Sequence, residues 1–177
     1  MRELFARAFG GFYKLPPKLP HGENMYKKIL VAIDGSEPSN HALDHAVEIA
    51  TKFKAKLIML AVVQRVIIPI FPDEGFGGIP LSAAKDMAQY QDKMRLAYQN
   101  VLDESDAKIK EEHPGLEVEA ILKEGRPSAT ITDYAENDGV DLIVMGSRGI
   151  GGYTGWILGS TSRRVVDSCT KPILIVK

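Results

Sequence analysis

The sequence predicts an α/β protein in which a single, doubly wound, five-stranded parallel sheet carries helices on both faces. Five short apolar segments have the length and composition of buried strands, and segments with helical periodicity separate them. Strands that alternate with helices pair in parallel through right-handed crossovers, which produces this architecture. The chain has 177 residues, of which 45% are hydrophobic and 25% charged, so it fits one such domain.

The first strand and the first helix of the domain have the clearest signals. Residues 29–33 are an almost unbroken apolar run that ends at Asp34, Gly35 and Ser36, which is typical of a buried strand followed by a turn. Ser36 is suited to cap the next helix, and Pro38 to occupy its first turn. The stripe of this helix that faces the core comprises Ala42, Leu43, Ala46, Ile49, Ala50 and Phe53.

The remaining elements follow in the order that the fold class requires. Residues 64–81 contain three prolines and three glycines, which predicts a long irregular loop. A long polar helix is expected over residues 82–112, with a core-facing stripe of Met87, Tyr90, Met94, Ala97, Val101 and Ile109. The other predicted strands span residues 57–63, 118–122, 142–145 and 173–176, and the other predicted helices residues 129–135 and 161–167.

Residues 1–24 differ from the rest of the chain. They contain Pro16, Pro17 and Pro20, and their four basic and two acidic side chains give a charge of +2. We expect a flexible N-terminal extension here, followed by a single domain over residues 25–177.

Charge and composition exclude several classes of function. Lys and Arg number 22 against 23 Asp and Glu, so the chain lacks the basic excess of a nucleic-acid-binding protein. No apolar run reaches the ~18 residues that a membrane span requires. A single cysteine, Cys169, is compatible with a reducing compartment. We therefore expect a soluble, cytoplasmic protein that binds neither nucleic acid nor a membrane.

The predicted architecture also places a binding site. Ligands of doubly wound sheets lie outside the carboxyl ends of the strands, where the winding direction reverses. If the two halves wind in opposite directions, the first and fourth strands are neighbours at that reversal. The turn at residues 34–36 and the loop that begins with residues 146–149 would then face each other across one crevice.

The loop after the fourth strand has the composition of a phosphate site. Six of the 16 glycines lie between Gly146 and Gly159, so successive backbone N–H groups are free to turn toward an anion. The loop ends at Gly159, Ser160, Thr161 and Ser162, where a helix is expected to begin, and a helix N-terminus favours phosphate. The loop lacks the lysine of a P-loop and the final glycine of the dinucleotide-binding fingerprint.

These residues resemble the nucleotide-binding branch of the universal stress protein family. Gly146 and Gly149, followed after nine residues by Gly159 and Ser160, match its pattern G-x-x-G, nine residues, then G-[ST]. Residues 26–39, 125–127 and 171–176 are similar to the opening strand and turn and to the later signatures of the family. The resemblance covers residues 25–177 and implies the sheet order 3-2-1-4-5 of the adenine nucleotide alpha hydrolase-like fold.

The resemblance also implies a ligand, ATP or the related ADP or AMP, and a set of contacts. Asp34 would approach the ribose or a phosphate-bound Mg²⁺ or Mn²⁺, and the backbone at Ala32 and Val63 would frame the adenine. The phosphates would be held by Gly146, Arg148, Gly149, Gly159, Ser160 and Thr161. Ile33, Ser147 and Ser162 complete the expected set of nucleotide-binding residues. Members of the family usually form homodimers through the last strand, here residues 173–176.

Three functions remain open at this point. The sequence offers Asp34 as one carboxylate facing the phosphates and no nucleophile paired with a base, so no catalytic residue is assigned. The first interpretation is therefore a stress-linked regulatory protein that uses the nucleotide as a conformational ligand and acts on an unknown protein partner. The alternatives are a slow ATPase and an interaction module whose pocket is vestigial.

Overall fold

The five strands form one parallel sheet in the computed structural model, which describes residues 25–65, 81–150 and 158–177. The strands are β1 (Lys28–Ala32), β2 (Lys56–Val63), β3 (Val118–Glu124), β4 (Leu142–Gly146) and β5 (Ile173–Val176). Their order is β3-β2-β1-β4-β5, and every neighbouring pair is parallel. The predicted fold class and strand order are confirmed.

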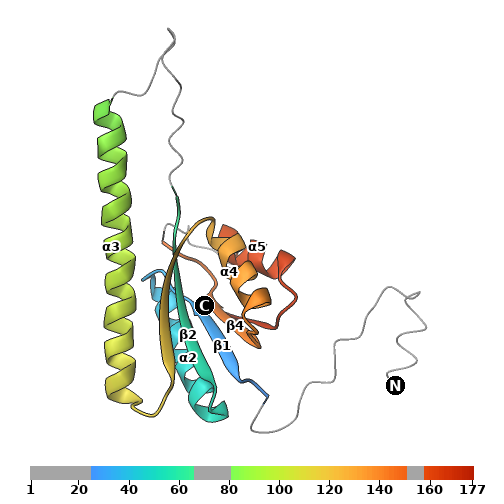
Figure 1. Cartoon of the computed structure of the whole chain (residues 1–177). Helices are drawn as coiled ribbons and strands as arrows, with labels where there is room; N and C mark the ends of the chain where they lie inside the picture. The colour runs from blue at the N-terminus through green and yellow to red at the C-terminus, as the bar shows by residue number, and fades with distance from the viewer. Residues whose placement is uncertain (1–24, 66–80, 151–157) are drawn as a thin grey trace, which may run out of the picture.

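Helices cover both faces of this sheet (Figure 1). On one face, α2 (Glu37–Phe53) and α3 (Leu81–Glu112) pack over β1 residues Ile29 and Val31. On the other, α4 (Pro127–Asn137) and α5 (Ser160–Ser168) pack over Leu30. Successive side chains of a strand point to opposite faces, and both faces of β1 are covered, so its residues 29–32 are all apolar. The edge strand β3 is partly exposed.

The turn after β1 is built as the sequence predicts. The Ser36 side chain accepts a hydrogen bond from the Ser39 backbone N–H at 3.4 Å and caps α2, with a proline in the first turn. Gly35 has φ +82°, a backbone conformation that residues with a Cβ rarely adopt. A Cβ at this position would also lie 3.0 Å from Val101 Cγ2 of α3.

The long helix α3 covers the sheet with only part of its length. Leu102 and Ile109 are buried, 0% and 4% exposed, whereas Tyr90 and Leu96 are 57% and 62% exposed. Figure 1 shows that the N-terminal part of α3 extends past the end of the sheet. The predictions that Tyr90 and Ala97 face the core are therefore wrong, since both are exposed. Helical periodicity does not reveal where a helix passes the edge of its sheet.

β3 and α4 are longer than their patterns predict. β3 continues to Glu124, and the Gly125 N–H donates to the Val63 carbonyl oxygen at 3.0 Å, which extends the pairing with β2. The helix α4 begins at Pro127, in the first-turn position that proline favours. The predicted extension at residues 1–24 and most of the predicted loop at 64–81 lie outside the described residues. No helix in the described part of the chain is long and apolar enough to span a bilayer.

Candidate functional site

A pocket of about 380 Å³ opens at the carboxyl ends of β1, β2 and β4. This is the edge at which the winding direction reverses, since β1 lies between β2 and β4. The pocket brings together ten of the twelve predicted site residues: Ala32, Ile33, Asp34, Gly146, Arg148, Gly149, Gly159, Ser160, Thr161 and Ser162.

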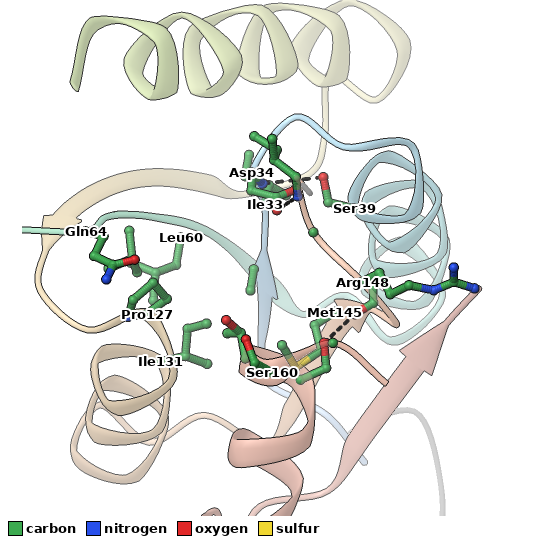
Figure 2. A pocket seen from close by; sticks show the side chains of 18 of the residues that line it. Ile33, Asp34, Ser39, Leu60, Gln64, Pro127, Ile131, Met145, Arg148 and Ser160 are labelled. Atoms are coloured by element: carbon green, nitrogen blue, oxygen red, sulfur yellow. Dashed lines mark hydrogen bonds between the residues drawn. The ribbon is translucent and has the colours of Figure 1, made fainter. Parts of the chain in front are cut away.

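One end of the pocket is apolar. Leu60, Val62 and Gln64 lie at alternate positions of β2 and its exit, so they share one side of the strand. Pro127 and Ile131 of α4 line the pocket as well, and Figure 2 shows both side chains near Leu60 and Gln64. A flat apolar group that binds between these side chains would be removed from water, which is favourable.

Asp34 bridges the two loops on the side of the pocket opposite Ser160 (Figure 2). Its Oδ1 accepts hydrogen bonds from the Ser36 backbone N–H at 3.0 Å and the Ser36 hydroxyl at 2.6 Å. Its Oδ2 accepts from the Ile150 backbone N–H at 3.1 Å. The two polar strand exits therefore meet across one crevice, as the winding of the sheet requires.

Two glycines of the loop keep backbone segments close together. A Cβ on Gly149 would collide with Asp34 Oδ2, so this glycine permits the contact between the loop and the β1 exit. A Cβ on Gly146 would lie 2.7 Å from the Pro38 carbonyl carbon and 2.9 Å from the Ser39 nitrogen. Gly146 therefore allows the start of α2 to approach β4.

The N-terminus of α5 supplies hydrogen-bond donors. Gly159 is the N-cap, and the Arg163 N–H donates to its carbonyl oxygen at 2.9 Å as the first bond of the helix. The N–H groups of Ser160, Thr161 and Ser162 precede that bond and so have no partner within the helix. Figure 2 shows Ser160 on the opposite side of the pocket from Asp34.

Ser162 holds this helix in place. Its hydroxyl is buried and donates to the Gly146 carbonyl oxygen at 2.9 Å, which joins the first turn of α5 to the end of β4. Since that donor is occupied, the side-chain donors that remain at this end of the pocket are those of Ser160 and Thr161.

Three predicted site residues have a different position from the one expected. The Arg148 side chain is directed away from the pocket in Figure 2, so its backbone forms the wall. Both backbone groups of Ser147 are used, since its N–H donates to Val176 at 2.6 Å and its carbonyl oxygen accepts from Gly159 at 2.8 Å. Val63 does not line the pocket, whereas its neighbour Val62 does.

Several lining residues did not emerge from the sequence: Ser39, Leu60, Val62, Gln64, Tyr98, Pro127, Ile131, Met145 and Ile150. The alternation of side chains along β2 is a signal that could have identified Leu60, Val62 and Gln64 together. Tyr98 belongs to α3, and no local pattern shows which turn of a 32-residue helix reaches the pocket.

The phenol of Tyr98 is half-buried at this site. Burial raises the pKa of Tyr98 above its ordinary value, and the nearby negative charge of Asp34 raises it further. The Tyr98 hydroxyl therefore remains protonated at neutral pH and is able to donate a hydrogen bond. Within the described residues, no cluster of three or more His, Cys, Asp or Glu side chains could hold a metal ion.

Comparisons with known proteins agree on one family. Residues 25–177 match the model of the universal stress protein family. The chain is similar to universal stress protein YxiE of Bacillus subtilis, with 37% identity over 86% of this chain and 100% of that protein.

Solved structures show the same fold. The chain resembles the universal stress protein UspA from Lactobacillus plantarum, with a TM-score of 0.71, 24% identity, and coverage of 86% of this chain and 98% of that one. It also resembles the family protein At3g01520 from Arabidopsis thaliana, which was solved with AMP bound. That match has a TM-score of 0.55 and 21% identity, and covers 85% of this chain and 91% of that one.

Proposed function

The chain belongs to the universal stress protein family, and from this premise we propose that its pocket binds an adenine nucleotide. One observation carries the proposal: a single pocket is apolar at one end and presents backbone and hydroxyl donors at the other. An adenine nucleotide has the same division, with a flat base at one end and an anionic phosphate chain at the other.

The base would lie at the apolar end. Leu60, Val62 and Ile131 form walls for an aromatic ring, and Met145 adds a polarisable thioether. Burial of apolar ring surface there contributes affinity without specifying the nucleotide's phosphate count. The pocket is thus compatible with AMP, ADP and ATP, and AMP is the ligand of the Arabidopsis relative.

The phosphates would lie against α5. The first-turn N–H groups and the hydroxyls of Ser160 and Thr161 are suited to an anion, and the helix dipole adds a partial positive charge. Gly149 allows the loop backbone to come close to the same region. Among the phosphate contacts that the family motif implies, Gly149, Ser160 and Thr161 line this part of the pocket.

Asp34 would lie between base and phosphates, where it is suited to accept hydrogen bonds from ribose hydroxyls. It is also the single carboxylate among the described lining residues. Three hydrogen bonds already occupy part of its capacity of about four lone pairs. Any Mg²⁺ or Mn²⁺ would therefore be held mainly by the phosphates, with Asp34 as a protein ligand.

We propose a regulatory role in which the nucleotide acts as a conformational ligand. The described lining residues include one carboxylate and no histidine, lysine or cysteine, which gives little basis for activating a nucleophile. The ligand instead joins segments that are far apart in the chain, namely the exits of β1 and β2, the loop after β4 and the start of α5. Binding would stabilise their arrangement for a protein partner in the cytoplasm.

The test is to denature freshly purified protein and to identify the released small molecules by mass spectrometry, together with binding of added AMP and ATP by calorimetry. The key variant is Gly149→Ala, whose methyl group would displace Asp34. The matched control is Gly115→Ala, because a Cβ at Gly115 meets nothing within 4 Å.

We expect an adenine nucleotide in the parent and the control and at least a roughly tenfold weaker affinity in Gly149→Ala, since the methyl group displaces a carboxylate that makes charge-assisted hydrogen bonds. Parent protein that carries no nucleotide and fails to bind added AMP or ATP would refute the proposal and favour the vestigial pocket.

A further inference from the structure

The pocket has a wall that the family motif does not include, and it comes from α3. Tyr98 of this helix lines the pocket, and its half-buried ring lies close enough to Asp34 for the carboxylate charge to raise its pKa. The hydroxyl is thus a protonated donor in the pocket that Asp34, a hydrogen-bond acceptor, also lines.

Contacts on both sides of Tyr98 fix its position at the pocket. Two turns before it, the Gln91 side chain donates from Nε2 to the Gln64 backbone carbonyl oxygen at 3.3 Å, at the apolar end. One turn after it, Val101 lies against Gly35, next to Asp34. The helix therefore contacts both rims of the pocket, with Tyr98 between those contacts.

The position of Tyr98 places it next to the middle part of a bound nucleotide, the sugar. The base requires the apolar end near Leu60 and Val62, and the phosphates require the N-terminus of α5. The sugar lies between these two parts, on the side where Asp34 is found. A phenol and a carboxylate together complement the two hydroxyls of a ribose, since one donates and the other accepts.

We propose that Tyr98 hydrogen-bonds to a ribose hydroxyl of the bound nucleotide and so selects for a ribonucleotide. This inference rests on the proposed function, because it requires a nucleotide in the pocket. It makes Tyr98 a specificity-determining residue that α3, rather than the glycine loop, contributes to the site.

The test compares two ligands on two variants of the full chain by calorimetry. The ligands are AMP and 2′,3′-dideoxy-AMP, which differ only in the ribose hydroxyls. The variants are Tyr98→Phe, which removes the hydroxyl and keeps the ring, and Tyr90→Phe, a control on the same helix at a tyrosine that is 57% exposed. For AMP, we expect Tyr98→Phe to bind roughly fivefold more weakly than the parent, the cost of one neutral hydrogen bond. For the dideoxy ligand, parent and Tyr98→Phe should bind equally.

Each other outcome is decisive as well. If Tyr98→Phe binds AMP as the parent does, or weakens both ligands by the same factor, Tyr98 makes no ribose contact and the inference is overturned. A parent that binds neither ligand would overturn this inference, and if it also failed to bind added ATP the proposed function would be overturned with it.

Discussion

Gly146 and Gly149 belong to one motif, but each is needed for a different physical reason. The carboxylate of Asp34, a pocket residue, occupies the position that a Cβ on Gly149 would need. Backbone atoms of Pro38 and Ser39, at the start of α2, occupy the position that a Cβ on Gly146 would need. A side chain is able to rotate away, whereas the backbone of a buried helix start is not. Substitution should therefore affect binding at one glycine and stability at the other.

We predict that Gly146→Ala lowers the free energy of unfolding by about 1–3 kcal/mol, the usual cost of forcing an extra methyl group into a packed site. Urea denaturation followed by circular dichroism measures this change. Gly115→Ala is the control, since its added methyl group enters open space. A Gly146→Ala protein as stable as the control would show that α2 shifts away from β4 without cost.

Among the helices, α4 is joined to the segment after α5 through the carboxylate of Glu136. Glu136, at the end of α4, accepts hydrogen bonds from the Thr170 backbone N–H at 2.7 Å and from the Thr170 hydroxyl at 2.7 Å. Thr170 follows α5 and precedes β5, so this contact fixes the path between them. The Thr170 N–H, and then its hydroxyl, lower the pKa of Glu136 below its ordinary value of 4.5.

The lowered pKa of Glu136 gives a stability that depends on pH. The ionised carboxylate is favoured in the folded state, so its contribution is complete above pH 4.5 and is lost as the pH falls through the lower folded-state pKa. We predict that Glu136→Gln is less stable than the parent at pH 7 and that the difference shrinks toward pH 3. Urea unfolding at stepped pH values measures it, with Glu104→Gln on the exposed side of α3 as control. A difference that stays constant over this range would contradict the assigned cause.

The helices and strands also show how much of the fold and of the site can be predicted from the sequence. The apolar runs identified all five strands, because central parallel strands are buried on both faces and tolerate few polar residues. The glycine loop was identified because backbone that approaches a ligand or another segment closely needs residues without Cβ. The predicted core-facing stripe of α3 included the exposed Tyr90 and omitted Tyr98, which lines the pocket, because only the tertiary position of α3 shows which of its turns reaches the site.

For the whole molecule, the two edges of the sheet differ. β3 forms one edge and contacts α3. β5 forms the other edge and carries partly exposed apolar side chains. The carbonyl oxygens of Pro172 and Val176 accept hydrogen bonds from the backbone N–H groups of Ile143, within β4, and Ser147, directly after it. Backbone groups alternate in direction along a strand, so the N–H groups of Ile173 and Ile175 point away from β4. An edge of this kind is a template for another strand.

We propose that the chain forms a homodimer in which β5 pairs with its copy across a two-fold axis, because such pairing satisfies these groups in both protomers. Ile175→Pro should convert the dimer to a monomer, since proline removes an outward N–H while the bonds from Ile143 and Ser147 remain. Ile175→Val is the matched control, because it keeps the N–H and a β-branched side chain. Sedimentation equilibrium of the parent and both variants measures the mass. A parent that sediments as a monomer would refute the homodimer. An Ile175→Pro variant that remains dimeric would show that the protomers pair through another surface.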